Sequence, residues 1–293
     1  MSLEEKSINR ANYLLEDIFK SGLYPKMKRS KNKLDQLKES IKAHFINGER
    51  RRYELTGGLV AKFVQQPIYE TDELGLKEFL YDYGVLHKVV TLKFSPSAAE
   101  KDDIREIIKE LEPFQLPCEY TAQIYIRSLG KSMIDKTQYR FDNLELCHLS
   151  RKYKLEKSFE VRAETLYKKK VEEIRNLLLE NRNFTIESDF ASCKIRKKCI
   201  NYNTKELLQN MGPKYLFEYG EISLKKLEPF IWSGYFSISD LQQFRKKVDM
   251  KLKFIIMDVE SERRQAEFYH SKLIDISQKL RISTEEKQQL PKA

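Results

Sequence analysis

Residues 237–280 read SISDLQQFRKKVDMKLKFIIMDVESERRQAEFYHSKLIDISQKL, and we expect the rest of the chain to be arranged around this segment. It contains no Gly or Pro, and its apolar residues recur at helical steps of three and four, with one gap between Val259 and Ala266. Ser239 or Asp240 can cap the start by accepting a hydrogen bond from an unpaired N–H group. We expect one long amphipathic helix whose apolar stripe exceeds what its own domain can bury.

Part of this segment also fits a strand. Within residues 251–259 (KLKFIIMDV), Leu252, Phe254 and Ile256 lie on one side of an alternating pattern rich in β-forming residues. The alternative is therefore a strand over 251–259 followed by a shorter helix, Glu260–Leu280. A short apolar run cannot be assigned by its period alone, so both interpretations stay open.

The first half of the chain alternates between helical and strand patterns. Two amphipathic helices, Ser2–Gly22 and Leu34–Phe45, are expected first, joined by a basic linker over residues 26–33. Alternating or β-rich segments then predict strands at 53–64, 85–94 and 120–128, the first interrupted by Gly57-Gly58 and the second carrying the best strand signal. Helical patterns lie between these strands. We therefore expect a mixed α/β domain over residues 1–150 that includes the two leading helices.

The second half is expected to be mainly helical, giving an α+β protein overall. A long helix is predicted for Phe159–Glu180, with Leu166 and Ile174 among its inward residues. Residues 184–190 and 194–200 predict a small two-stranded unit, and the long C-terminal helix follows. The domain boundaries are thus 1–150 and 151–293, with a disordered tail over 288–293.

A dense group of aromatic residues stands between these elements, over residues 214–236. Its last members, Phe230, Trp232, Tyr235 and Phe236, form a candidate protein interface, because aromatic side chains dominate binding hot spots. The same density is typical of a packed corner of the core. Sequence alone does not choose between the two.

The chain is basic, with a net charge of +10, and this charge favours partners that carry negative charge. Two clusters stand out, and they provide candidate contacts to phosphate or to an acidic partner: Lys28, Arg29, Arg50, Arg51 and Arg52. Such clusters bind nucleic acid by releasing counterions from phosphate. The alternative is a solvated lysine-rich surface, because lysine is spread along most of the chain.

Four cysteines are too few for a disulfide framework in 293 residues. Cys193 and Cys199 are separated by five residues, which is longer than the usual zinc-ligand spacing, and Cys147 stands next to His148. A composite zinc site from these residues is one interpretation, and unligated thiols are the favoured one. We expect no cofactor.

Catalytic motifs are absent from the sequence. It contains no G-x-G-x-x-G, G-x-x-x-x-G-K-[ST], H-E-x-x-H or G-x-S-x-G pattern. Asp249 and Lys251, or Glu187 and Asp189, have the crude spacing of a metal-dependent nuclease. With 44 acidic and 54 basic residues, such spacings are common by chance. We expect a protein that is not an enzyme.

Composition indicates a folded protein away from membranes. Hydrophobic residues make up 41% and aromatic residues 11%, enough for a core, while the charged fraction of 33% exceeds the usual quarter. No apolar run approaches the roughly 18 residues of a membrane span, and residues 1–10 are polar. We expect a cytoplasmic protein.

The bias toward Lys, Ile, Glu, Asn and Tyr, and stretches such as Leu55–Phe94, resemble an accessory gene product of a phage of AT-rich Gram-positive bacteria. In length and residue usage the whole chain is similar to the Gabija anti-defence proteins, although no diagnostic motif is shared. The resemblance implies a non-enzymatic factor that oligomerises, binds a host defence nuclease complex in the host cytoplasm and inhibits it. The long amphipathic helices allow the same function, because a coiled-coil stripe can bury its surplus against another copy. The alternative is a basic nucleic-acid-binding phage or plasmid protein.

Overall fold

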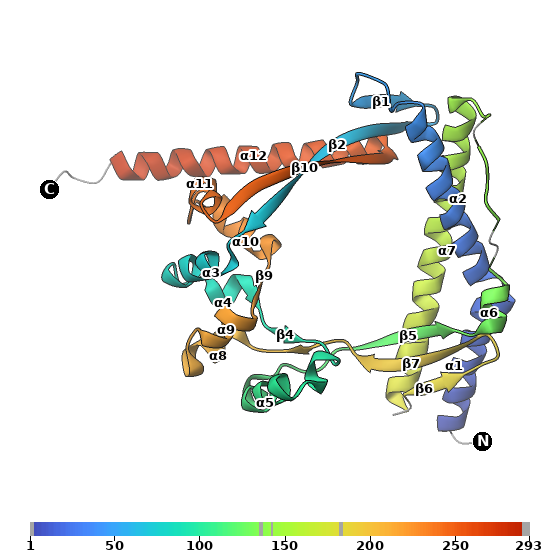
Figure 1. Cartoon of the computed structure of the whole chain (residues 1–293), viewed down its shortest axis with the longest axis horizontal. Helices are drawn as coiled ribbons and strands as arrows, with labels where there is room; N and C mark the ends of the chain where they lie inside the picture. Colours follow the sequence, from blue (N-terminus) through green and yellow to red (C-terminus); the bar gives the residue numbers. More distant parts are fainter. Residues whose placement is uncertain (1–2, 135–136, 142, 182–183, 289–293) are drawn as a thin grey trace. The chain divides into compact units, whose positions relative to one another are not determined.

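The computed structural model describes residues 3–134, 137–141, 143–181 and 184–288 (Figure 1). It is a mixed α+β structure with 56% helix and 22% strand. Strands occur throughout the chain, so the expected order of a mixed N-terminal lobe followed by a mainly helical C-terminal part is wrong. Ser2 of the first expected helix and residues 289–293 of the expected tail lie outside the described residues.

The elements follow one another in a mixed order along the chain. The α-helices are α1 (Leu3–Lys20), α2 (Leu23–Ala43), α3 (Glu73–Asp82), α4 (Leu86–Val89), α5 (Asp102–Glu110), α6 (Ser128–Ser132), α7 (Leu146–Glu180), α8 (Thr204–Met211), α9 (Lys214–Tyr219), α10 (Leu224–Trp232), α11 (Ile238–Gln242) and α12 (Val259–Gln288). The strands are β1 (Arg52–Leu55), β2 (Leu59–Thr71), β3 (Val90–Thr91), β4 (Lys93–Phe94), β5 (Tyr120–Ile126), β6 (Thr185–Glu187), β7 (Ala191–Lys197), β8 (Ile200–Asn201), β9 (Glu221–Ile222) and β10 (Arg245–Asp258). Their sheets have the orders β1-β2-β10, β5-β7-β6, β3-β9 and β4-β8.

The chain forms two compact units, each assembled from separate segments. Unit 1 comprises residues 1–63, 120–198 and 254–259, and unit 2 comprises residues 64–119, 199–253 and 260–293. Each unit takes residues from both sides of position 150. The units therefore differ in outline from the expected domains 1–150 and 151–293.

Unit 1 is built on α7, which packs along α1 and α2 (Figure 1). The predicted amphipathic first helix is confirmed as α1, and its apolar residues Ala11, Leu15 and Ile18 are fully buried with Ile174 and Leu178 of α7. Ion pairs also link α7 to α1 and α2 beside the apolar contacts. Arg10 of α1 bonds Glu173 at 2.6 Å, and Lys33 of α2 bonds Glu156 at 2.9 Å.

The second helix begins earlier than expected. Helix α2 starts at Leu23, so the basic residues 26–33 are helical and the predicted linker is wrong. Lys and Arg are good helix formers, and Pro25 lies in the first turn, where a missing N–H costs little. The basic cluster is therefore part of a rigid helix.

The strands of unit 1 are close to their predicted positions. In the antiparallel sheet β5-β7-β6, Ile124 and Ile186 both pair with Cys193, and this face packs on the core. The predicted strand at 120–128 is confirmed over residues 120–126. The expected two-stranded unit at 184–200 corresponds to β6 and β7, which form a three-stranded sheet together with β5. The hairpin β1–β2 is confirmed as well, with Gly57 and Gly58 at φ values of 83° and 72° in its loop, a conformation that favours glycine.

Unit 2 has a separate core, formed by α3, α4, α8–α11 and the short strands, and this core corrects the prediction for 85–94. Val85, Leu86, Val89 and Val90 are all buried, which is a helical spacing. The expected single strand is therefore α4 followed by the short strands β3 and β4. The apolar residues of 85–90 follow the helical period of 3.6 residues and not the strand period of two, so the prediction of one strand is wrong.

The expected continuous helix over 237–280 is wrong, and the alternative with a strand is confirmed. The segment forms α11, the strand β10 and then α12. The cap of α11 is Ser237, whose hydroxyl accepts from the Asp240 N–H at 3.1 Å while the Asp240 carboxylate accepts from the Ser237 N–H at 2.7 Å. β-forming residues prefer a strand when a neighbouring strand supplies the hydrogen bonds, and β2 does so here.

Two further features bear on the surface. In α7, Ile174 is buried as expected, but Leu166 is 53% exposed and was wrongly expected to face inward. Among the helices of the described part of the chain, none is long and apolar enough to cross a bilayer.

The core of unit 1 gives the first prediction. Ile174→Ala should lower the free energy of unfolding by about 2–5 kcal/mol in urea denaturation, because it leaves a cavity among fully buried side chains. Val161→Ala is the matched control on the same helix, since Val161 is 47% exposed, and it should change stability by no more than about 0.5 kcal/mol. Equal effects of the two substitutions would contradict this packing of α7.

Candidate protein-binding surfaces

A regularly spaced apolar surface of unit 1 lies on α7. Leu155, Phe159 and Leu166 are 57%, 50% and 53% exposed, respectively. At about 100° per residue they fall within roughly 40° of one another around the helix, and Val161 falls about 120° from Leu155. We call Leu155, Phe159 and Leu166 the α7 stripe.

The stripe is distinct from the face that holds α7 in the core. Ile174 and Leu178 are fully buried against α1 and the sheet, and Leu149 is fully buried in a second cluster with α2. The stripe has the spacing of four and seven residues that is typical of helix-to-helix contact. This signal was present in the sequence, but the sequence did not show which apolar residues were already used by the core.

The aromatic segment predicted as an interface is divided between core and surface. Phe236 is only 3% exposed and belongs to the core of unit 2, and Phe230 packs partly buried against it. Tyr235 is 52% exposed, and its hydroxyl donates to the Tyr83 carbonyl at 3.1 Å. Of these three, only Tyr235 offers a large accessible ring.

Trp232 connects this segment to α12. The Lys272 ammonium lies 3.7 Å from the centre of the Trp232 ring and 4.4 Å from that of Phe268. A cation over an aromatic face is stabilised by the ring quadrupole. Phe268 and Tyr269 stay 53% and 55% exposed. We call Trp232, Phe268, Tyr269 and Lys272 the α12 aromatic surface.

A groove between α3 and α9 adds a third surface feature in unit 2. Its volume is about 560 Å³, and it is lined by Glu73, Leu74, Lys77, Lys214, Phe217 and Glu218. Lys77 is 4% exposed, and its ammonium donates to the Phe217 carbonyl at 2.8 Å, which links α3 to α9. The lysine therefore has a structural contact within the groove wall.

The residues predicted to contact phosphate lie in two places, at the start of β1 and on α2. Arg50, Arg51 and Arg52 are exposed at the start of β1, and Arg52 bonds Glu54 at 2.9 Å. Lys28 and Arg29 lie on α2 beside tyrosines. Arg29 donates to the Tyr139 hydroxyl at 2.8 Å, and the Lys28 ammonium lies 5.4 Å from the Tyr24 ring centre.

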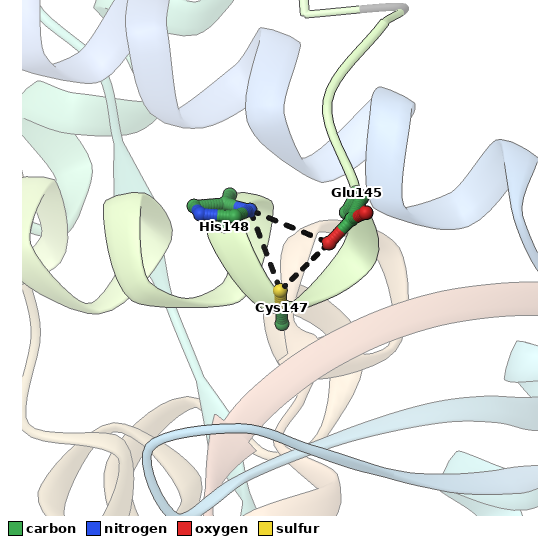
Figure 2. A group of neighbouring side chains, drawn as sticks. All are labelled: Glu145, Cys147 and His148. Atoms are coloured by element: carbon green, nitrogen blue, oxygen red, sulfur yellow. Dashed lines mark hydrogen bonds and ion pairs between the residues drawn. The ribbon is translucent and has the colours of Figure 1, made fainter.

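The cysteines do not form the composite zinc site that the sequence allowed. Cys193 is fully buried in unit 1, where burial raises the pKa of its thiol to about 11. Cys147 and His148 instead lie together with Glu145, a residue that sequence reasoning missed (Figure 2). Neither Cys193 nor Cys199 belongs to this group.

The carboxylates considered for nuclease chemistry are on the surface. Glu187 forms an ion pair with Arg127, and Asp189, Asp249 and Lys251 are exposed. Over the described ranges, none of these acids belongs to a cluster of three or more side chains whose ligand atoms are close enough to share a metal ion.

Comparison with known proteins gives no match. No protein-family model, no curated protein and no solved structure matches the chain. The surfaces described above are therefore interpreted from their own chemistry.

Cys193 gives a prediction that tests the placement of the thiols. In native protein at pH 8, at most three of the four cysteines should react with a thiol reagent, because Cys193 is buried and its pKa of about 11 keeps it protonated. Urea should expose the fourth. In Cys193→Ala, the native count should stay the same and the denatured count should fall by one. A lower native count in this variant would contradict the burial of Cys193.

Proposed function

We propose that the chain is a non-enzymatic protein-binding factor that self-associates and inhibits a host defence complex, as a phage or mobile-element accessory protein. The observation that carries the proposal is the α7 stripe. Its three large apolar side chains are each about half exposed and lie on one line of a helix that is 35 residues long. Large exposed apolar side chains in a row are typical of protein interaction sites.

Magnitudes indicate what the stripe contributes. Full burial of a Leu or Phe side chain is worth about 1.5–3 kcal/mol, and half of that surface is already covered in the unit. Two copies meeting through the stripe then gain about 6 kcal/mol, against an association cost of at least about 4 kcal/mol. The stripe therefore anchors a homo-oligomeric interface, and polar residues around it complete the contact.

The α12 aromatic surface provides a second contact region, suited to the target protein. Trp and Tyr are enriched in binding hot spots, and this surface presents the half-exposed Tyr269 together with Trp232, whose ring lies under the cation of Lys272. A basic chain with net charge +10 also favours an acidic partner. The resemblance to Gabija anti-defence proteins supports a host defence nuclease complex as the target.

The oligomer gives a testable prediction. In size-exclusion chromatography with light scattering, the protein should elute as a defined oligomer, and Phe159→Glu should convert it to monomer, because a charge would be buried in the anchored interface. Val161→Glu is the matched control on the same helix and should leave the oligomer intact, since Val161 lies off the stripe with similar exposure, 47%.

The same variants provide the functional readout. In bacteria that carry a Gabija defence system, the unmodified protein and Val161→Glu should restore phage plating, and Phe159→Glu should not. A monomeric protein at tens of micromolar, or an oligomer unaffected by Phe159→Glu, would contradict the role of the stripe. An oligomer that does not restore plating would contradict the inhibitor function alone.

The alternative function is binding to nucleic acid, and the exposure of Arg50, Arg51 and Arg52 favours it. It predicts that a DNA oligonucleotide is retarded at low salt and released at high salt, because binding is driven by counterion release. Replacing the three arginines by glutamine should weaken this binding by about tenfold or more. Replacing Lys225, Lys226 and Lys246 in the same way is a charge-matched control that should have a smaller effect. DNA binding that does not change with salt or with these arginines would contradict the alternative.

A further inference from the structure

The start of α7 brings three different metal-ligating side chains to one point of the surface (Figure 2). Glu145 is the N-cap residue of the helix, and Cys147 and His148 lie in its first turn. The Cys147 Sγ lies 3.4 Å from His148 Nδ1 and 3.5 Å from Glu145 Oε2, and the third pair, Nδ1 to Oε2, is separated by 3.7 Å. The three donor atoms thus form a nearly equilateral triangle.

This triangle has the size that a tetrahedral ion requires. Zinc bonds to sulfur, nitrogen and oxygen are about 2.0–2.3 Å long, so neighbouring ligand atoms in a tetrahedron are about 3.3–3.8 Å apart. All three separations at Glu145, Cys147 and His148 lie in this interval. One ion can therefore contact all three atoms without rearrangement of the backbone.

The same geometry argues against a nucleophile–base relay. In such a relay, the histidine receives the thiol proton on one ring nitrogen and is oriented by a carboxylate on the other. Here the Cys147 thiol and the Glu145 carboxylate both face Nδ1 of His148. All three donor atoms instead lie close to one another, as ligand atoms around a shared ion do.

We propose that Glu145, Cys147 and His148 form a zinc-binding site whose fourth position is open to water or to an exogenous ligand. Sulfur, imidazole nitrogen and carboxylate oxygen are the ligand types that zinc selects. Binding would transfer the thiol proton of Cys147 to solvent, and the thiolate and carboxylate would balance the charge of Zn²⁺. In the described part of the chain, no fourth Cys, His, Asp or Glu belongs to the group.

The surroundings hold the trio in place and leave it accessible. The Thr56 hydroxyl in the β1–β2 loop donates to the Cys147 carbonyl at 3.0 Å, and the Lys154 ammonium donates to the Gly57 carbonyl at 2.5 Å. These bonds fix the first turns of α7 against the loop. The Glu145 and His148 side chains are 80% and 58% exposed, so an ion can enter from solvent.

The test is zinc binding by the full, untagged chain after treatment with a chelator. Titration against a chromophoric chelator should show one equivalent of Zn²⁺ per chain, and Co²⁺ should give a sulfur-to-metal charge-transfer band. Cys147→Ser and His148→Gln should each weaken zinc binding by at least about tenfold, since even changes around the ligands of a metal cost that much. Cys147→Ser should also remove the charge-transfer band.

Cys118→Ser and His44→Gln are controls of the same residue types, with Cys118 half-buried as Cys147 is and His44 exposed as His148 is. They should bind zinc as the unmodified chain does. Far-ultraviolet circular dichroism would verify that every variant is folded. The proposal is overturned if the chain shows no saturable binding with a Kd below about 100 µM. It is equally overturned if Cys147→Ser and His148→Gln bind as tightly as the controls.

Discussion

The burial of one face of α7 is the constraint on which unit 1 depends. Leu149, Ile174 and Leu178 are fully covered by α1, α2 and the sheet β5-β7-β6, because a helix of 35 residues needs partners along its length. Ion pairs such as Arg10–Glu173 lie at the edges and add little by comparison. Once this face is buried, helical geometry fixes the directions of the other side chains of α7.

The burial of that face also determines which side chains of α7 form the surfaces on which both proposals rest. The α7 stripe is an apolar line that stays exposed beside the buried face of the helix, and the Glu145–Cys147–His148 group lies at the start of the same helix. A single rigid element can thus present a contact surface and a metal-ligand triangle. Side chains on a helix that is held along its length are positioned more precisely than those on a loop.

Local periodicity was enough to predict several elements. The stripe of Ala11, Leu15 and Ile18 gave α1, the alternation of Ala122, Ile124 and Ile126 gave β5, and Gly57-Gly58 gave the β1–β2 loop. Each of these patterns is complete within a few residues. The aromatic segment is visible in the sequence, but the burial of Phe236 and the exposure of Tyr235 depend on which side chains pack against them, and sequence does not contain this information.

The sequence by itself determined the α+β class, the amphipathic first helix, the strands near residues 185–197 and the basic, aromatic-rich composition of the chain. Only the tertiary structure decided that residues 245–258 form β10, because β2, which supplies its ladder, is far away in the chain. It also decided that Val85–Val90 is largely helical, because the core of unit 2 covers all four of its apolar residues. Glu145 lies beside Cys147 and His148 because it is the N-cap residue of α7 and they lie in its first turn, whereas the sequence pattern placed the start of this helix at Phe159.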